Sequence, residues 1–222
     1  MMIWIIFIAL TLASLLVQGT LRRRFARYSQ EPLSSGLTGA QVAQKMLYDN
    51  GIYDVSVIAT NGTLTDHYDP TKKTIALSED VYNSCSIAAA AVAAHETGHA
   101  VQDATAYAPL RMRSALVPVV KFASMTVQWV ILAGLILINV FPNLLWVGIA
   151  MFAMTTLFSL ITLPVEVNAS RRAIAWLTDS GVVDYDNRPM AIDALKWAAF
   201  TYFIAAVSSL ATLFYYIGIA RR

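Results

Sequence analysis

The chain has 222 residues, of which 57% are hydrophobic and 14% are charged, and its mean hydropathy is +0.56. This composition is too apolar for an ordinary soluble domain and is typical of a membrane protein. The formal net charge is only +2. The basic residues lie near the ends of apolar runs rather than along a stripe with stacking aromatics, which argues against nucleic acid as a partner.

Four apolar runs are candidate membrane spans, and they cover residues 2–18, 116–141, 144–163 and 197–220. A helix needs about 20 apolar residues to cross hydrocarbon, so the first run has about the minimum length. A signal peptide is the alternative for that run, but a signal carries its positive charge before the apolar segment, whereas three arginines follow it at 22–24. We therefore expect a retained anchor. The break at Pro142 predicts that the second and third runs form a hairpin.

The orientation follows from Lys and Arg near span ends, which are enriched on the cytoplasmic side. Most of these basic residues follow the first and third apolar runs or precede the second and fourth, which are ends on the same side of the membrane. Arg221 and Arg222 follow the fourth run and lie on the opposite side. We expect both the N-terminus and the C-terminus outside and both hydrophilic segments in the cytoplasm.

The segment between the first and second runs predicts a small α+β fold. Thr38 is placed to cap a helix through Asn50, with Gly51 as its left-handed stop. Alternating β-prone runs at 53–59, 63–68 and 74–77, separated by Asn61-Gly62 and Asp69-Pro70-Thr71, predict a three-stranded meander. Its last strand would be an exposed edge that either pairs with an extended peptide or serves only as structure.

The sequence His95-Glu96-Thr97-Gly98-His99 is an H-E-x-x-H motif at the end of an Ala-rich run that favours helix. Residues four apart on a helix lie one turn apart on one face, so both imidazoles can converge on a zinc ion. Glu96 would then lie beside the open coordination position and act as general base toward a water. A chance pattern on a solvated helix is the alternative.

A catalytic zinc site normally has three protein ligands, so a third must lie elsewhere. Thr105 occupies the position where a third histidine ligand would lie, which excludes a three-histidine site. Asp103 as a ligand would place three ligands in a row on one helix face, so we expect Asp103 to support a ligand from behind or to face solvent. Glu166 follows the third apolar run, where an unpartnered carboxylate is costly and a metal would compensate it. An interfacial glutamate facing water or pairing with Arg171 is the alternative.

Other polar residues are weaker candidates. Ser170 and Asn168 follow Glu166 on a predicted helix through Leu177 and could orient the metal ligands. His67, Tyr68 and Arg171 could stabilise an oxyanion, although His67 is better explained as a hydrogen-bonded sheet residue. The single cysteine, Cys85, is expected to be a small buried residue and is consistent with a reducing compartment.

Several of these segments resemble the bacterial YugP-type neutral zinc metallopeptidases. The resemblance rests on 64–70, Leu77-Ser78 with Val81-Tyr82, 86–89, 92–96, 98–100 with Gln102, and 163–166 with 168–170. More remotely, the motif helix and the downstream E-x-x-A are similar to the HtpX/Ste24 membrane peptidases. The resemblance implies His95, His99 and Glu166 as zinc ligands and Glu96 as general base. The HtpX/Ste24 pattern usually has Asp four residues after the third ligand, where this chain has Ser170.

The predicted fold class is a mainly α integral membrane protein with about four transmembrane helices and a small α+β zincin-like cytoplasmic domain, which combines a three-stranded β-meander with the HExxH helix. The expected segments are a transmembrane anchor at 1–20, a zincin-like subdomain at 21–113, a transmembrane hairpin at 114–165, a cytoplasmic segment with the third ligand at 166–196 and a last transmembrane helix at 197–222.

The expected function is that of a multi-pass endopeptidase of the bacterial cell membrane, with Zn²⁺ as cofactor and the active site facing the cytoplasm. Its expected partners are a membrane-associated peptide or protein substrate and the lipid bilayer, and oligomeric or regulatory membrane partners are further candidates. A catalytically inactive zinc-binding membrane adaptor or scaffold is the alternative.

Overall fold

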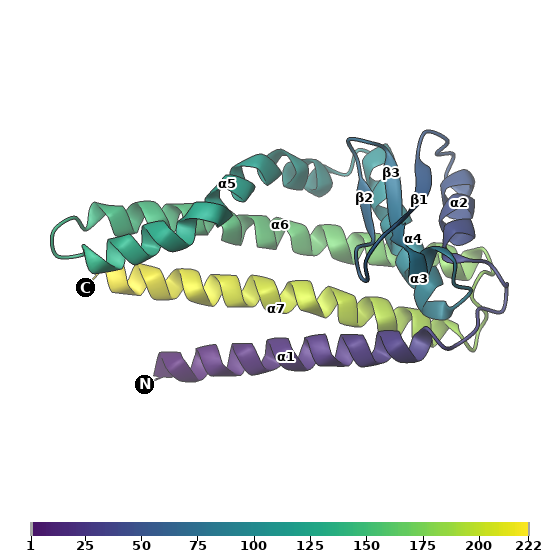
Figure 1. The fold of residues 1–222 in the computed structure, drawn as a ribbon, viewed down its shortest axis with the longest axis horizontal. Helices are drawn as coiled ribbons and strands as arrows, with labels where there is room; N and C mark the ends of the chain where they lie inside the picture. The colour runs from purple at the N-terminus through teal and green to yellow at the C-terminus, as the bar shows by residue number, and fades with distance from the viewer. Residues whose placement is uncertain (1, 222) are drawn as a thin grey trace. The chain divides into compact units, whose positions relative to one another are not determined.

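The computed structural model describes residues 2–221, which divide into two compact units. Unit 1 comprises 1–15, 108–164 and 201–222, and unit 2 comprises 16–107 and 165–200. Three long helices contribute residues to both units: α1 (Met2–Tyr28), α6 (Asn143–Asp179) and α7 (Arg188–Ala220) (Figure 1).

In the part of the chain that the structure describes, unit 1 consists of helices and short turns without strands, and it contains α5 (Ala108–Ile136). Close approaches at Gly134 beside Leu145 and at Gly148 beside Ile131 show that α5 packs antiparallel to the start of α6. Within the same unit, Thr156 and Ser209 join α6 to α7 through hydroxyl groups 2.8 Å apart. Helix α5 and the start of α6 therefore form a helical hairpin around Pro142.

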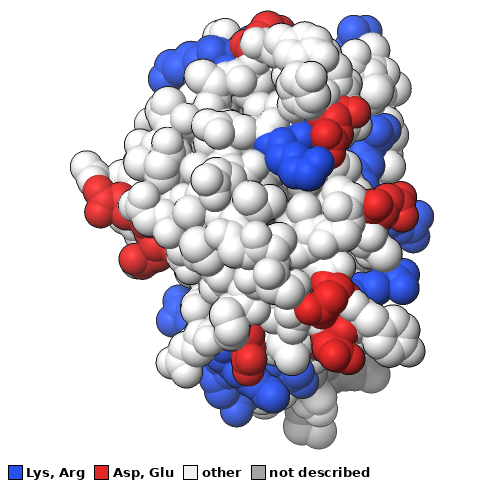
Figure 2. Space-filling view, turned by 90° about the vertical axis from the view of Figure 1, so that its right-hand side faces the viewer, with Lys and Arg blue, Asp and Glu red and all other residues white. Residues whose placement is uncertain are grey.

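Four helices in the described residues are long and apolar enough to cross a membrane: 4–28, 108–136, 143–179 and 188–220. Many of their large apolar side chains are exposed, for example Phe122, Trp129 and Ile136. All fourteen Asp and Glu residues, in contrast, belong to unit 2. Figure 2 shows one face of the molecule, on which acidic and basic groups are scattered among uncharged residues.

Unit 2 contains a three-stranded sheet, built from β1 (Ser56–Thr60), β2 (His67–Asp69) and β3 (Thr74–Ser78). The strand order is β1-β3-β2, with β1 parallel and β2 antiparallel to β3. The meander prediction is wrong, because β1 and β2 both pair with β3. The run Ile75-Ala76-Leu77 is buried on both faces, and such a continuous apolar strand belongs in the middle of a sheet.

The prediction of an exposed last strand is wrong for the same reason, since β3 is the central strand. The predicted strand at 63–68 is also shorter than expected. Gly62 and Leu64 have φ angles of 103° and 59°, which no strand can contain, and Asp66 turns its carboxylate to the backbone N–H and the hydroxyl of Ser78. The chain therefore crosses from one edge of the sheet to the other through 61–66.

Helix α2 (Gly39–Asp49) begins and ends as predicted. Thr38 and Gln41 form a capping box, and Gly51 follows with a φ of 69°. The helix buries Val42, Ala43, Met46 and Leu47 in a core shared with β3, α4 (Ile87–Ala104), the end of α6 and the start of α7. A short helix, α3 (Glu79–Tyr82), connects β3 to α4.

Gly39 gives a direct test of the packing between α2 and α3. A Cβ at this position would collide with the carbonyl oxygen of Val81, a backbone atom that has little freedom to move. We expect Gly39→Ala to lower stability by about 1–3 kcal/mol, as overpacking of cores typically does.

Thermal unfolding in detergent, followed by intrinsic fluorescence, would measure this effect. The matched control is Gly19→Ala in α1, where a Cβ meets nothing within 4 Å and helix propensity favours alanine by about 1 kcal/mol. Equal unfolding midpoints for the two variants would contradict the proposed close approach.

Candidate metal centre

Helix α4 presents the two histidines of the H-E-x-x-H motif. Ser86 caps the helix by accepting a hydrogen bond from the backbone N–H of Ala89. Nearly every alanine of the first turns is buried, so the helix is fixed in the core before it reaches His95. The rings of His95 and His99 lie edge to face with their centroids 4.9 Å apart. The helical presentation predicted for the motif is confirmed.

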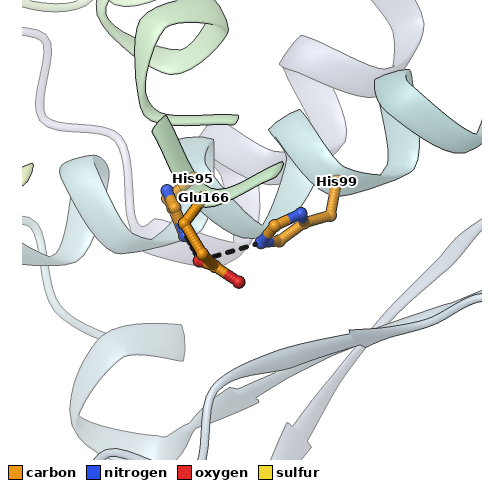
Figure 3. Close-up of side chains that lie close together, drawn as sticks. All are labelled: His95, His99 and Glu166. Carbon is orange, nitrogen blue, oxygen red and sulfur yellow. Dashed lines mark hydrogen bonds and ion pairs between the residues drawn. The ribbon is translucent and has the colours of Figure 1, made fainter. Parts of the chain in front are cut away.

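Glu166 of α6 completes the cluster (Figure 3). Its Oε2 atom lies 3.2 Å from Nε2 of His95 and 3.5 Å from Nε2 of His99. One donor atom from each of the three residues lies within 4.8 Å of the others. Glu166 is only 2% exposed, so the alternative of an interfacial glutamate facing water is wrong.

This donor set fits a zinc ion. Two imidazole nitrogens and one carboxylate oxygen form the kind of three-ligand set that catalytic zinc sites use, which leaves a fourth position open. A buried carboxylate also needs a positive partner, which a dication supplies.

The other nitrogen of each imidazole is held by a polar side chain. Nδ1 of His95 lies 3.1 Å from the Ser170 hydroxyl, and Nδ1 of His99 lies 3.0 Å from Oε1 of Gln102. These contacts leave both Nε2 atoms directed at Glu166. Ser170, four residues after Glu166, therefore contacts a candidate ligand although it is not an aspartate.

Gln102 connects His99 to α6 through a chain of hydrogen bonds. Its amide nitrogen donates to the carbonyl of Val165 at 2.8 Å and to Oδ1 of Asn168 at 3.0 Å. Arg172 donates from Nε to the same Asn168 oxygen. Because the amide nitrogen has two acceptors, Oε1 must face His99 and accept its Nδ1 proton. This fixes the tautomer in which Nε2 carries the lone pair.

Burial and charge act in opposite directions on His99. Burial alone would lower its pKa, but the hydrogen bond with Glu166 and the nearby charge of Glu96 outweigh it, so the pKa of His99 is raised. The cluster without a metal therefore favours a proton on this ring, and metal binding would displace it.

Gly98 allows the two helices to approach at the cluster. A Cβ on Gly98 would lie 2.7 Å from the carbonyl oxygen of Ala169, which is fully buried. The glycine lies between the two histidines in sequence, and Ala169 lies between Glu166 and Ser170. The absence of a side chain at this position thus allows Glu166 to reach both rings.

The remaining candidates lie in different surroundings. Glu96 is half-buried on α4. His67 is exposed on β2 and its Nδ1 lies 2.8 Å from the carbonyl oxygen of Thr65, so the expectation of a hydrogen-bonded sheet residue is confirmed. Arg171 is exposed on α6.

Tyr68 and Asp103 connect β2 to α4. The Tyr68 hydroxyl donates to Oδ2 of Asp103 at 2.8 Å, and Lys73 pairs with the same oxygen at 2.7 Å. Burial and the bond to Asp103 raise the pKa of Tyr68, so its hydroxyl remains a neutral donor. Asp103 thus links the sheet to α4. Neither expectation for this residue, a contact with the metal ligands or exposure to solvent, included this link.

The surroundings of two side chains differ from the sequence-based expectations. The sequence alone predicts no role for Gln102 in orienting a metal ligand. The signal for such a role is a polar residue in an apolar stretch, three residues after His99 on the same helix. The expectation of a buried Cys85 is wrong, because the side chain is exposed in the turn before α4.

The sequence has clear relatives. Residues 3–221 match the family described as "Putative neutral zinc metallopeptidase". The chain is 42% identical over 218 residues to the protein of Bacillus subtilis (strain 168) named "Putative membrane protease YugP", and the match covers 96% of each chain. No solved structure matches the chain.

The Gln102 contacts predict that this residue sets metal affinity. Gln102→Leu removes the acceptor for His99 and leaves the Val165 carbonyl without its donor, so we expect zinc affinity to fall about 10–100-fold, as for other residues that orient metal ligands. Competition with a chromogenic chelator would measure the affinity of the purified protein.

The control is Gln41→Leu, which alters the capping box of α2 and removes no contact of the cluster. It should lower stability without changing zinc affinity. Unchanged zinc affinity in the folded Gln102→Leu variant would show that the amide does not hold the ligand.

Proposed function

The chain belongs to the neutral zinc metallopeptidase family, and from this premise we propose that it is a membrane-bound endopeptidase with His95, His99 and Glu166 as zinc ligands and Glu96 as catalytic residue. The observation that carries the proposal is the convergence of two Nε2 atoms on one buried carboxylate. Family membership supports peptides or proteins as substrates, and the name of the B. subtilis relative supports association with a membrane.

When bound, Zn²⁺ would acidify a water and polarise the substrate carbonyl. His95, His99 and Glu166 would hold the ion, and a three-ligand set leaves a coordination position for the reactants. Ser170 and Gln102 contact the Nδ1 atoms of the two imidazoles and so hold both Nε2 atoms toward Glu166.

Glu96 follows the first ligand directly and would carry the proton. Its carboxylate accepts a proton from the attacking water and delivers it to the nitrogen of the leaving amine, so that the peptide bond breaks to an acid and an amine. Its half-buried position gives it access to solvent and substrate. His67, Tyr68 and Arg171 remain proposals for the donor that stabilises the oxyanion. For Tyr68, such a role requires its hydroxyl to leave Asp103.

We further propose that four helices cross the bacterial cell membrane and that unit 2 faces the cytoplasm. The helices at 4–28, 108–136, 143–179 and 188–220 have the required length and hydropathy. The arginines at 22–24 and near the other span ends support this orientation by the positive-inside rule. The restriction of Asp and Glu to unit 2 supports the same division between lipid and water.

The mechanism predicts different effects for two glutamate variants. Glu96→Gln should keep stoichiometric zinc and reduce peptide hydrolysis by at least about 100-fold, the scale of general base catalysis. Glu166→Ala should lose zinc, because one ligand of three is missing. Elemental analysis and hydrolysis of a quenched-fluorescent peptide library would measure both.

Asp179→Ala is the matched control, since it removes an exposed acid from the same helix as Glu166. It should retain both zinc and hydrolysis. Full hydrolysis by Glu96→Gln would overturn the mechanism, whereas zinc without hydrolysis in the wild type would favour the inactive adaptor.

The orientation can be tested with the exposed Cys85 as a natural probe. In intact cells, a membrane-impermeant maleimide should leave Cys85 unlabelled and should label it after permeabilisation. The matched variant Cys85→Ser/Asn143→Cys moves the thiol to the exposed first residue of α6, where it should react from outside. The reverse labelling pattern would show the opposite topology.

A further inference from the structure

A groove in unit 2 lies beside the face of α4 that carries Glu96. Its volume is about 1060 Å³, and its lining comes from the C-terminal part of α1, the loop at 63–66, α3, the start of α4 and α7. Ala89 and Val92 of α4 line it, and Glu96 follows Val92 by four residues. Positions 89, 92 and 96 share one helix face, so the groove leads along α4 toward the proposed catalytic carboxylate.

The lining has apolar walls and charged groups of both signs, since Arg22 lines it together with Asp66, Glu79 and Asp80. Leu21 and Phe25 of α1, Val81 of α3 and Leu195 of α7 supply apolar surface. Glu79 and Asp80, both exposed, add two carboxylates. An occupant with bulky apolar side chains and a neighbouring basic residue matches this surface.

Two walls of the groove are fixed to each other by a polar contact. Asp193 of α7 pairs with Arg24 of α1 at 3.0 Å and accepts a hydrogen bond from the Tyr28 hydroxyl at 2.7 Å. Arg24 and Asp193 directly precede the lining residues Phe25 and Ala194 in sequence. The contact between α1 and α7 therefore holds two walls of the groove together.

Leu64 lies at the groove in a strained conformation. It lines the groove with a φ of 59° and a side chain that is 64% exposed. A left-handed conformation is unfavourable for leucine, and glycine would remove the strain. A strained backbone that presents an apolar side chain beside a groove suggests a contact with a ligand.

We propose that this groove binds the apolar segment of a membrane-protein substrate, together with an adjacent basic residue, on one side of the bond to be cleaved. The proposal rests on the proposed function and on its orientation. One wall belongs to the end of a helix apolar enough to cross a membrane, so the groove lies where a substrate would leave the bilayer. On the cytoplasmic side, Lys and Arg directly follow apolar spans, and Glu79 and Asp80 would pair with them.

Binding can be measured without turnover in the Glu96→Gln full-length protein, reconstituted in nanodiscs. The probe is a fluorescein-labelled peptide with one lysine beside four leucines, followed by fluorescence anisotropy. Companion peptides replace the lysine by glutamate or the leucines by serine. We expect the lysine–leucine peptide to bind at least tenfold more tightly than either companion.

Three variants, each with a control, test the groove. Leu21→Trp should fill it and weaken binding at least tenfold, whereas Leu16→Trp, exposed and outside the lining, should not. Glu79→Gln/Asp80→Asn should weaken binding about twofold to tenfold, as expected for exposed ion pairs. The control for that pair of acids is Asp179→Asn/Asp186→Asn, which neutralises two exposed acids elsewhere.

The third variant separates recognition from stability. Leu64→Gly should weaken peptide binding while raising or preserving the thermal midpoint, because it removes both the side chain and the strain. Ala106→Gly relieves a similar φ of 55° outside the lining, so it should leave binding unchanged.

A photo-crosslinking amino acid at Leu21 would identify the occupant. Attachment of the peptide supports the proposal, and exclusive attachment of phospholipid overturns it. Unchanged peptide affinity in all three groove variants, with zinc content and wild-type hydrolysis intact, would also overturn it without affecting the proposed function. Groove-dependent binding by a protein that never hydrolyses peptides would instead support the groove and refute the peptidase assignment.

Discussion

The carboxylate of Glu166 is the interaction on which the rest of the site depends. At 2% exposure it has almost no contact with water, and a buried charge is tolerated only when opposite charge or several donors compensate it. Two imidazoles face its Oε2 atom, and either a proton on a ring or a metal dication can provide the compensation. The same arrangement of side chains therefore compensates the Glu166 charge both without a metal ion and with one bound.

Several local features of the sequence follow from that requirement. Gly98 removes the side chain that would separate α4 from α6 at Ala169. Gln102 and Ser170 contact the Nδ1 atoms, which keeps the Nε2 atom of each ring directed at Glu166. The metal centre is thus the contact between two helices: α4 supplies His95, His99 and Gln102, and α6 supplies Glu166 and Ser170.

The candidate site could be predicted from the sequence because each of its parts is encoded locally. The spacing of His95 and His99 fixes one face of a helix, and the cost of a carboxylate after an apolar run singles out Glu166. The order of the strands in the sheet, in contrast, is not encoded by short segments of sequence. The Asn61-Gly62 pair suggested a hairpin, but burial of Ile75 and Leu77 on both faces of the sheet decides which strand is central. The exposure of Cys85 likewise depends on tertiary packing, which its residue type does not encode.

The alanine-rich start of α4 has a function beyond helix propensity. At about 100° per residue, Gly98, Gln102 and the two histidines fall on the side of the helix that faces α6, while Ala89, Val92 and Glu96 fall on the adjacent side that lines or extends the groove. The remaining side is packed against the core of unit 2. A helix in contact on nearly all sides needs small residues so that its neighbours can approach closely. The alanines therefore bring the metal ligands, the proposed general base and the groove onto one short helix, where a substrate bound in the groove would extend toward Glu96.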